Sequence, residues 1–420
     1  MNLAPALFWL CIFIIFYTYI GYAVIALIIG KFRSLIVKSD SIFDLNFEPE
    51  ITLVIPCYNE FDVLKNKVQN CFDLDYPKDK LHIIFICDGS DDGSEKLLNN
   101  IEGITVLFEP NRLGKSAAEN RAMQFVKTPF VVFCDANTII NKSAIREIVK
   151  HYKNEKVGAV AGEKRIINNE KDTASAAGEA FYWRYESFLK RIDSNLYSTI
   201  GGAGELVSFR TCLYTLLESD TILDDFMQSM RIALKGYKVV YEPNAFAEET
   251  ASVNVSEELK RKIRISAGAW QAMSRLGKAF NPFHNVQLTF LFVSHKVIRW
   301  TLAPLAILFI IPINIYLNYY SDSIYNTIFF LQIIFYIFTI LGWFFEHQKI
   351  RFKLFYIPYY FFVTNLCMYL GFFRFLNGNQ SVRWERAKRA IYIYIERERE
   401  CERILFNQFN FCNFFLVLSR

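Results

Sequence analysis

The chain has 420 residues, of which 53% are hydrophobic and 17% aromatic, while only 21% carry a charge. This composition excludes a disordered or fibrous protein and is too apolar for an ordinary soluble enzyme. The formal net charge of +5 gives no reason to expect nucleic acid as a partner. Nine cysteines are scattered without metal-ligand spacing, which is typical of a reduced chain facing a cytosol. We therefore predict a membrane protein with a cytosolic globular domain.

An apolar segment predicts a first membrane helix within residues 1–30. Residues 7–29 carry no charge, and at about 1.5 Å per residue they can cross a hydrocarbon core of about 30 Å. The basic residues Lys31, Arg33 and Lys38 follow this stretch, whereas a signal peptide has them before it. By the positive-inside rule that end faces the cytosol. Residues 31–47 are then a juxtamembrane linker.

Residues 48–280 have the texture of an α/β domain. Polar stretches of helical period alternate with five short apolar runs, at 51–56, 82–87, 104–108, 130–134 and 157–161. Runs that are hydrophobic at every position predict strands covered on both faces. Their alternation with helices predicts a mostly parallel, doubly wound sheet.

The chain after residue 280 is again membrane-like. We expect an amphipathic interfacial helix at 281–300, where His295, Lys296 and Arg299 interrupt the apolar pattern, and membrane helices within 301–373. Three stretches, 301–317, 324–345 and 355–373, are long enough to span, or nearly so. Three crossings would leave the basic tail, 374–420, outside. One stretch, with 355–373 as the candidate, is therefore expected to be re-entrant or shallow.

Polar clusters follow three of the predicted strands, at the edge where open α/β sheets bind ligands. They are Cys57-Tyr58-Asn59-Glu60, Asp88-Gly89-Ser90 and Asp135-Ala136-Asn137. Any one of them is more simply explained as a turn or a helix cap. Three in this order favour one shared pocket. Neither the glycine-rich dinucleotide fingerprint nor the P-loop motif is present, so those folds lose their main support.

Two segments could bind a charged ligand. Asp135 and Asn137 are spaced so that two oxygen ligands on one turn could bind Mg²⁺ or Mn²⁺, with water and phosphate oxygens completing the shell. Residues 111–115, ending in Lys115, could present N–H groups and an ammonium to an anion, although any helix N-terminus gives the same pattern.

Two later segments also carry charge. Asp224 and Asp225 open a predicted helix, where the dipole favours carboxylates whether or not they have a function. The basic stretch 260–264 has the character of an amphipathic helix on anionic lipid headgroups. For Arg264 and Trp270 we favour a functional interpretation, with the arginine against a diphosphate and the tryptophan against a sugar face.

Together these motifs resemble the processive, membrane-embedded family 2 glycosyltransferases, the group of cellulose, hyaluronan and poly-N-acetylglucosamine synthases. The resemblance covers residues 48–280, and the apolar segments on both sides are similar to that group's plan. It implies a Rossmann-like GT-A fold and a nucleotide-sugar donor, with a UDP-sugar expected. It also implies a divalent cation, Mg²⁺ or Mn²⁺, and a glycan or lipid-linked acceptor at the membrane.

The resemblance implies roles for the donor-site residues. Pro56, Tyr58 and Glu60 match the strand-end motif that lies against the nucleotide base and ribose. Asp88 matches the carboxylate that recognises the uracil, and Lys115 matches the basic residue near the nucleotide.

The same resemblance extends to the reacting centre. Asp135 and Asn137 stand where the family has its metal-binding DxD motif, and Asp225 matches the general base. Arg264 is the residue of the QxxRW motif that stays in register. The aromatic stretch 181–185 and the glycine-rich stretch 201–205 resemble regions that line the family's acceptor path, although core packing and a flexible turn explain them equally well.

The chain departs from the family pattern in three places. Asn137 replaces the second Asp of DxD, which weakens the metal prediction, and Asp224 replaces the Glu before the base. The QxxRW motif falls on 261–265 without its tryptophan, while Trp270 lies six residues beyond Arg264. A literal match at 380–384 follows the membrane segments, and we interpret it as coincidence. The loss of the motif in register weakens the prediction of a polymeric product.

The expected reaction is an inverting sugar transfer, with Asp225 as base, in an integral membrane protein of the plasma membrane. Its catalytic domain would be cytosolic and in contact with membrane lipids. Two alternatives stay open: transfer of one sugar to a lipid carrier, and a degenerate, non-catalytic membrane subunit. Product length separates the first from a polymerase, and the joint presence of Asp88, Asp135 and Asp225 argues against the second.

Overall fold

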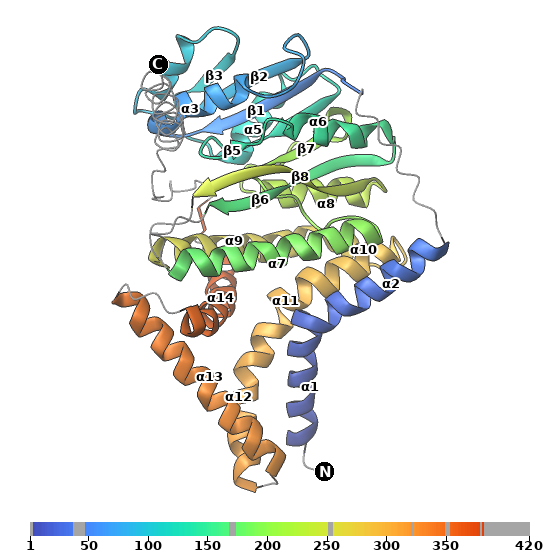
Figure 1. Cartoon of the computed structure of the whole chain (residues 1–420), viewed down its shortest axis with the longest axis vertical. Coiled ribbons are helices and arrows are strands. Elements are labelled where there is room, and N and C mark those ends of the chain that lie inside the picture. The colour runs from blue at the N-terminus through green and yellow to red at the C-terminus, as the bar shows by residue number, and fades with distance from the viewer. Residues whose placement is uncertain are drawn as a thin grey trace, which may run out of the picture.

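A computed structural model of the chain describes residues 3–36, 47–167, 174–250, 255–320, 323–348, 353–378 and 380–381. Figure 1 shows an α/β domain stacked on long helices, with the N-terminus at the far end of those helices. Most of the predicted linker and the tail beyond residue 381 lie outside the described residues.

One mixed sheet of eight strands, in the order β3-β2-β1-β4-β7-β6-β8-β5, forms the domain. β1 runs parallel to β2 and β4, β2 to β3, and β6 to β8, whereas β7 is antiparallel to β4 and β6, and β5 to β8. The mostly parallel α/β fold is therefore confirmed, with antiparallel strands added. The strands are β1 Ile51–Cys57, β2 Leu81–Asp88, β3 Thr105–Glu109, β4 Phe130–Phe133, β5 Ile139–Ile140, β6 Val157–Ile167, β7 Val207–Arg210 and β8 Lys238–Thr250.

Both faces of the sheet are covered, as the continuous apolar runs predict. On one face Ile51, Leu53 and Ile55 of β1 pack with α3 (Phe61–Phe72), α4 (Ser94–Asn99), α6 (Ala144–Val149) and η2 (Lys150–Lys153). On the other face Val54 joins a core shared with α5 (Lys115–Met123), α7 (Ala174–Leu196), α8 (Asp224–Leu234) and α9 (Val255–Arg275). Two short 3₁₀ turns, η3 (Thr211–Leu213) and η4 (Gly277–Phe280), complete the domain.

Among the described residues, three helices are long and apolar enough to cross a membrane: Ala4–Arg33, Leu302–Tyr319 and Ile324–His347. The first combines α1 (Ala4–Phe16), the π-helical turn η1 (Tyr17–Gly21) and α2 (Tyr22–Ile36), and the others lie within α12 (Leu302–Tyr320) and α13 (Ser323–His347). Phe8 of α1 packs against Ala306 and Ile310 of α12. The Arg33 guanidinium at the basic end of α2 donates to the carbonyl of Leu196 in α7. That basic end therefore lies beside the α/β domain.

The third C-terminal stretch forms α14 (Lys353–Leu376), which packs against α9 and α7 of the domain. Figure 1 shows α14 nearly end-on beneath α9, whereas α13 runs obliquely away from α12. Gly371 permits this close approach, since a Cβ there would lie 2.3 Å from the Cβ of Ser266. α14 therefore packs on the domain. The expectation, from the positive-inside argument, that this stretch is re-entrant or shallow stays a prediction.

The charges that suggested an interfacial helix at 281–300 point into the protein. This region consists of α10 (Val286–Leu291), the π-helical η5 (Phe292–Val297) and α11 (Ile298–Trp300). His295 and Lys296 are buried, and His295 Nδ1 lies 2.5 Å from Asp193 Oδ2 of α7. Lys296 and Arg299 both bind Glu186 of α7. These residues therefore tie η5 to the domain instead of facing lipid headgroups.

The contact between α14 and α9 can be tested at Gly371. A methyl group there would also lie 2.7 Å from the backbone nitrogen of Ala267, so Gly371→Ala should overpack the contact at a cost of about 1–3 kcal/mol. We expect a lower melting temperature in detergent. Gly30→Ala in α2, where no atom lies within 4 Å, is the matched control and should melt at or above the wild-type temperature. Equal melting of the two variants would contradict the packing.

Candidate active site

A large cavity opens at the carboxyl ends of β1 and β4, with a volume of about 1990 Å³. It extends from the sheet to the helices nearest the membrane segments. Its lining includes Pro56, Glu60, Lys115, Asp135, Asn137, Asp225 and Arg264 at the domain end, and Lys296, Trp300, Thr364 and Met368 at the other. The structure thus brings together seven of the ten predicted site residues.

The turn after β1 is held by polar contacts to the segment after β2. Asn59 adopts a left-handed conformation with φ 52°, and its side chain exchanges hydrogen bonds with Asp91. Pro56 and Glu60 line the cavity, but Tyr58 does not. The Tyr58 ring instead carries the Arg112 guanidinium, 3.6 Å from its centroid. Contact of Tyr58 with a nucleotide stays a prediction.

Asp88, at the end of β2, is fully buried and does not line the cavity. Its carboxylate accepts hydrogen bonds from the backbone N–H groups of Leu113 (3.1 Å) and Gly114 (2.7 Å), and from Arg121 (3.1 Å). These contacts fix the loop that leads into α5. In this geometry Asp88 positions that loop, and its contact with a uracil stays a prediction.

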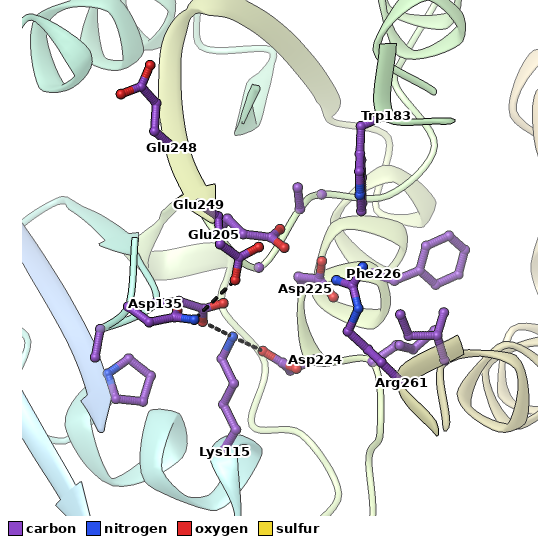
Figure 2. A pocket seen from close by; sticks show the side chains of 18 of the residues that line it. Lys115, Asp135, Trp183, Glu205, Asp224, Asp225, Phe226, Glu248, Glu249 and Arg261 are labelled. Carbon is purple, nitrogen blue, oxygen red and sulfur yellow. Dashed lines mark hydrogen bonds and ion pairs between the residues drawn. The ribbon is translucent and has the colours of Figure 1, made fainter. Parts of the chain in front are cut away.

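Lys115, the first residue of α5, gathers carboxylates from three elements. Its Nζ lies 2.7 Å from Asp135, 3.6 Å from Asp224 and 3.9 Å from Glu119 (Figure 2). Burial alone would lower the pKa of the ammonium, but these three carboxylates hold that pKa well above its usual value. Lys115 is therefore a firmly protonated cation in a pocket rich in negative charge.

Asp135 and Asn137 follow β4, as predicted. Burial raises the pKa of the Asp135 carboxyl, opposed by Lys115 and reinforced by Glu205 and Glu249. The Asn137 side-chain amide donates to Glu249 of β8 at 3.1 Å. Among the described residues no group of three or more His, Cys, Asp or Glu side chains has the arrangement of a metal site. A cation bound between Asp135 and Asn137 would also need oxygen ligands from the bound substrate or from water.

Asp225 lies on the first turn of α8, across the cavity from Asp135 (Figure 2). Burial and the neighbouring Asp224 raise the pKa of its carboxyl to about 6, despite the opposing charge of Lys115. A carboxylate with that pKa is largely ionised near neutral pH and more basic than an ordinary aspartate. It therefore suits the role of general base.

A second buried ammonium organises the opposite wall. Lys164 of β6 pairs with Glu205 and with Glu249, the latter at 2.5 Å, and its Nζ lies 4.7 Å from the Trp183 ring centroid. Arg261 of α9 is bound by Glu179 and Glu258. No sequence spacing pointed to this network, because its members come from distant segments. The pairing of β6 with β8 brings Lys164 near Glu249, and the other members lie on α7, α9 and the segment before β7.

Of the two α9 residues with a predicted function, one lies at the cavity and the other lies away from it. Arg264 lines the cavity and donates to the carbonyl of Ile222 at 3.4 Å, while its Nε is buried without a hydrogen-bond partner in the described part of the chain. Trp270 does not line the cavity and packs on Phe372 of α14, with ring centroids 4.5 Å apart. Six residues are about 1.7 helical turns, so Trp270 faces away from Arg264. The predicted sugar contact of Trp270 has no support in this geometry.

The literal QxxRW match at 380–384 lies closer to the site than expected. Gln380 and Ser381, which follow α14, line the cavity together with Arg374. The remaining three residues of the match lie outside the described residues. The interpretation of this match as coincidence overlooked that α14 returns the chain to the domain.

Comparison with known proteins places this geometry in context. Residues 52–210 match the sequence family described as glycosyl transferase family 2. Over 254 residues the chain is 28% identical to a poly-β-1,6-N-acetyl-D-glucosamine synthase of Staphylococcus aureus, covering 56% of this chain and 60% of that protein. A Staphylococcus epidermidis protein of the same name is 28% identical over 255 residues, covering 58% and 59%. The chain thus spans about 60% of the length of these relatives.

Among solved structures, the fold is similar to a mannosyltransferase of Pyrobaculum calidifontis, solved with GDP-mannose and Mn²⁺. The TM-score is 0.69 at 19% sequence identity, and the match covers 89% of this chain and 99% of the other. At this identity the likeness concerns the fold alone.

The positioning role of Asp88 yields a measurable prediction. Asp88→Asn removes the charge that holds two backbone N–H groups and Arg121, each such bond being worth about 1.5–3 kcal/mol. We expect a lower melting temperature together with weaker nucleotide binding, whereas Asp91→Asn, at an exposed position, should change the melting temperature little. An Asp88→Asn protein that melts like wild type but loses nucleotide binding would show that Asp88 acts by direct contact with the donor.

Proposed function

Because residues 52–210 of the chain are a family 2 glycosyltransferase domain, we propose that the protein is an inverting glycosyltransferase acting at a membrane. The observation that carries the proposal is a single cavity in which Asp225, a carboxylate of raised pKa, faces Asp135. The cationic side chains of Lys115 in α5 and Arg264 in α9 line the same cavity. The reaction needs a base for the acceptor and cations for the leaving diphosphate, and this cavity has both.

The donor is a nucleotide-sugar whose base and ribose lie against Pro56 and Glu60, at the carboxyl end of β1. We propose a UDP-sugar, in line with the match of Asp88 to the uracil-recognising carboxylate of the family. The mannosyltransferase of similar fold binds GDP-mannose. GDP-sugars are therefore the first alternative donors to compare.

The residues after β4 fit a divalent cation that is coordinated mainly by phosphate and water oxygens. Asp135 supplies a carboxylate and Asn137 an amide oxygen, and Mg²⁺ or Mn²⁺ commonly takes one or two protein oxygens with phosphate and water completing its shell. Burial raises the pKa of Asp135, and Glu205 and Glu249 add negative charge that opposes the effect of Lys115. When bound, the cation neutralises charge on the diphosphate.

The chain's own residues perform the transfer by direct displacement. Asp225 accepts the proton of an acceptor hydroxyl, whose oxygen bonds to the anomeric carbon as the bond from that carbon to the diphosphate oxygen breaks. The attack comes from the face opposite the nucleotide, so the configuration inverts. The Lys115 ammonium and the Arg264 guanidinium stabilise the negative charge of the departing diphosphate.

The acceptor enters from the membrane side of the cavity. Trp300 and Met368, from the segments that lead to and follow the apolar helices, line that end. The similarity to poly-N-acetylglucosamine synthases favours a growing glycan. The absence of a tryptophan next to Arg264 keeps single-sugar transfer to a lipid carrier as the second candidate. Arg33 beside the domain supports a cytosolic active site at the plasma membrane.

Radiolabel transfer by the purified full chain in detergent tests this function. UDP- and GDP-sugars are offered with Mn²⁺ or Mg²⁺, and EDTA should abolish the transfer. Long, enzyme-digestible material would establish a polysaccharide synthase, whereas a solvent-extractable product with one sugar would establish a lipid transferase. Folded protein that neither transfers a sugar nor releases nucleotide from any donor would contradict both and favour the non-catalytic subunit.

The role of Asp225 predicts how the activity responds to mutation and pH. Asp225→Asn should lower turnover by about 10²–10⁴-fold while leaving nucleotide affinity unchanged, because the base contributes to the reaction and not to donor binding. Since the pKa of this carboxyl is raised to about 6, wild-type turnover should fall as the pH drops below that value and the base becomes protonated. The residual activity of Asp225→Asn should lack this acid limb. Near-normal turnover of the variant would exclude Asp225 as the base.

A further inference from the structure

The position of the transferred sugar follows from the proposed reaction. The sugar must lie between Asp135, on the diphosphate side, and Asp225, on the acceptor side. Glu205 lines the same cavity as both carboxylates and directly follows Gly204, which lies beside the Asp225 side chain. Figure 2 shows Glu205 and Glu249 across the cavity from Lys115 and Asp224. Glu205 therefore borders the space that the sugar occupies.

The residue before Glu205 leaves that space open. A Cβ at Gly204 would lie 3.0 Å from Lys115 Nζ and 3.7 Å from an Asp225 carboxylate oxygen. The backbone at 204 thus forms a wall directly beside the two groups. A side chain here would occupy room next to the base.

Glu205 has hydrogen-bonding capacity to spare. A carboxylate offers about four acceptor positions. Among the described residues its side chain accepts hydrogen bonds from its own backbone N–H and from Lys164, with which it forms an ion pair. This ion pair keeps the carboxylate ionised, and sugar hydroxyl or amide N–H groups are the natural donors to its remaining positions.

Three cationic side chains near Glu205 already form ion pairs with carboxylates of the protein. Lys164 shares one charge between Glu205 and Glu249, Arg261 is bound by Glu179 and Glu258, and Lys262 lies 3.5 Å from Glu258. Four carboxylates thus face three cationic side chains. An additional carboxylate on the sugar would add like charge to a network in which the carboxylates already outnumber the cations that pair with them.

We infer that Glu205 hydrogen-bonds the transferred sugar and restricts the donor to uncharged sugars, so that uronate donors are rejected. The inference rests on the proposed glycosyltransferase function and names the substrate class of the same site. A neutral hexose or N-acetylhexosamine presents hydroxyl and amide donors to the carboxylate. A hexuronate places an anion against it, an arrangement that typically costs several kcal/mol.

Matched donors that differ only at C6 test this inference: UDP-glucose against UDP-glucuronate, and GDP-mannose against GDP-mannuronate. Transfer and equilibrium binding are measured on the full chain with Mn²⁺, with UDP and GDP alone as reference ligands. We expect the neutral sugar of the pair that binds to be preferred at least about 100-fold. Equal use of the neutral and anionic sugars would overturn the inference while leaving the transferase function intact.

Glu205→Gln separates the role of this side chain from a general effect on the fold. The variant keeps an acceptor oxygen for Lys164, so we expect it to fold. UDP or GDP affinity should stay within about twofold, neutral-donor affinity should fall about tenfold, and the discrimination against uronate should narrow. Glu163→Gln, a neighbour of Lys164 that does not line the cavity, is the matched control and should behave like wild type. Unchanged discrimination in Glu205→Gln would overturn the inference. If neither UDP nor GDP binds the wild type, the proposed function fails instead.

Discussion

The cavity depends on the burial of an ammonium ion among carboxylates. Lys115 lies between Asp135 and Asp224 and offsets the repulsion of these two carboxylates, whereas burial and the nearby Asp224 raise the pKa of Glu119 well above its usual value. The position of Lys115 in turn depends on Asp88, whose carboxylate fixes the backbone just before α5. A fully buried side chain at the end of β2 thereby sets the geometry of groups on α5, β4 and α8.

The same device recurs on the opposite wall, where Lys164 joins Glu205 to Glu249. Each ammonium compensates only part of the negative charge around it, which explains why burial leaves the carboxyls of Asp135 and Asp225 with raised pKa values. Added positive charge would favour the entry of an anionic diphosphate into such a site. The proposed binding of a divalent cation and the proposed preference for an uncharged sugar would therefore both follow from one electrostatic arrangement.

The sequence predicted those parts of the fold and site whose signals are local. The five continuous apolar runs became β1, β2, β3, β4 and β6. In β1, β2, β4 and the first half of β6 nearly every residue is buried, so these strands need no alternation, whereas the edge strand β3 is partly exposed. β8 was missed since its buried and polar positions alternate, and with it the partners of Asn137 and Lys164. The cavity residues that follow β1 and β4 were predicted correctly, because the carboxyl ends of parallel strands meet at the same edge of the sheet. The predicted sugar contact of Trp270 found no support, because it was based on spacing along the sequence and ignored the direction in which the side chain leaves the helix.

The join between domain and membrane helices determines where the cavity can open. Asp193 of α7 accepts a hydrogen bond from Tyr22 of the first membrane helix and lies against His295 of η5, so both membrane segments are attached to one helix of the domain. From the end of η5 the chain continues to Trp300, whose ring meets Phe226 edge-on with centroids 5.4 Å apart. Phe226 directly follows the proposed base. The attachment that anchors the domain thus also places the Trp300 ring against Phe226, where the two rings form part of the cavity wall between the membrane side and the proposed base.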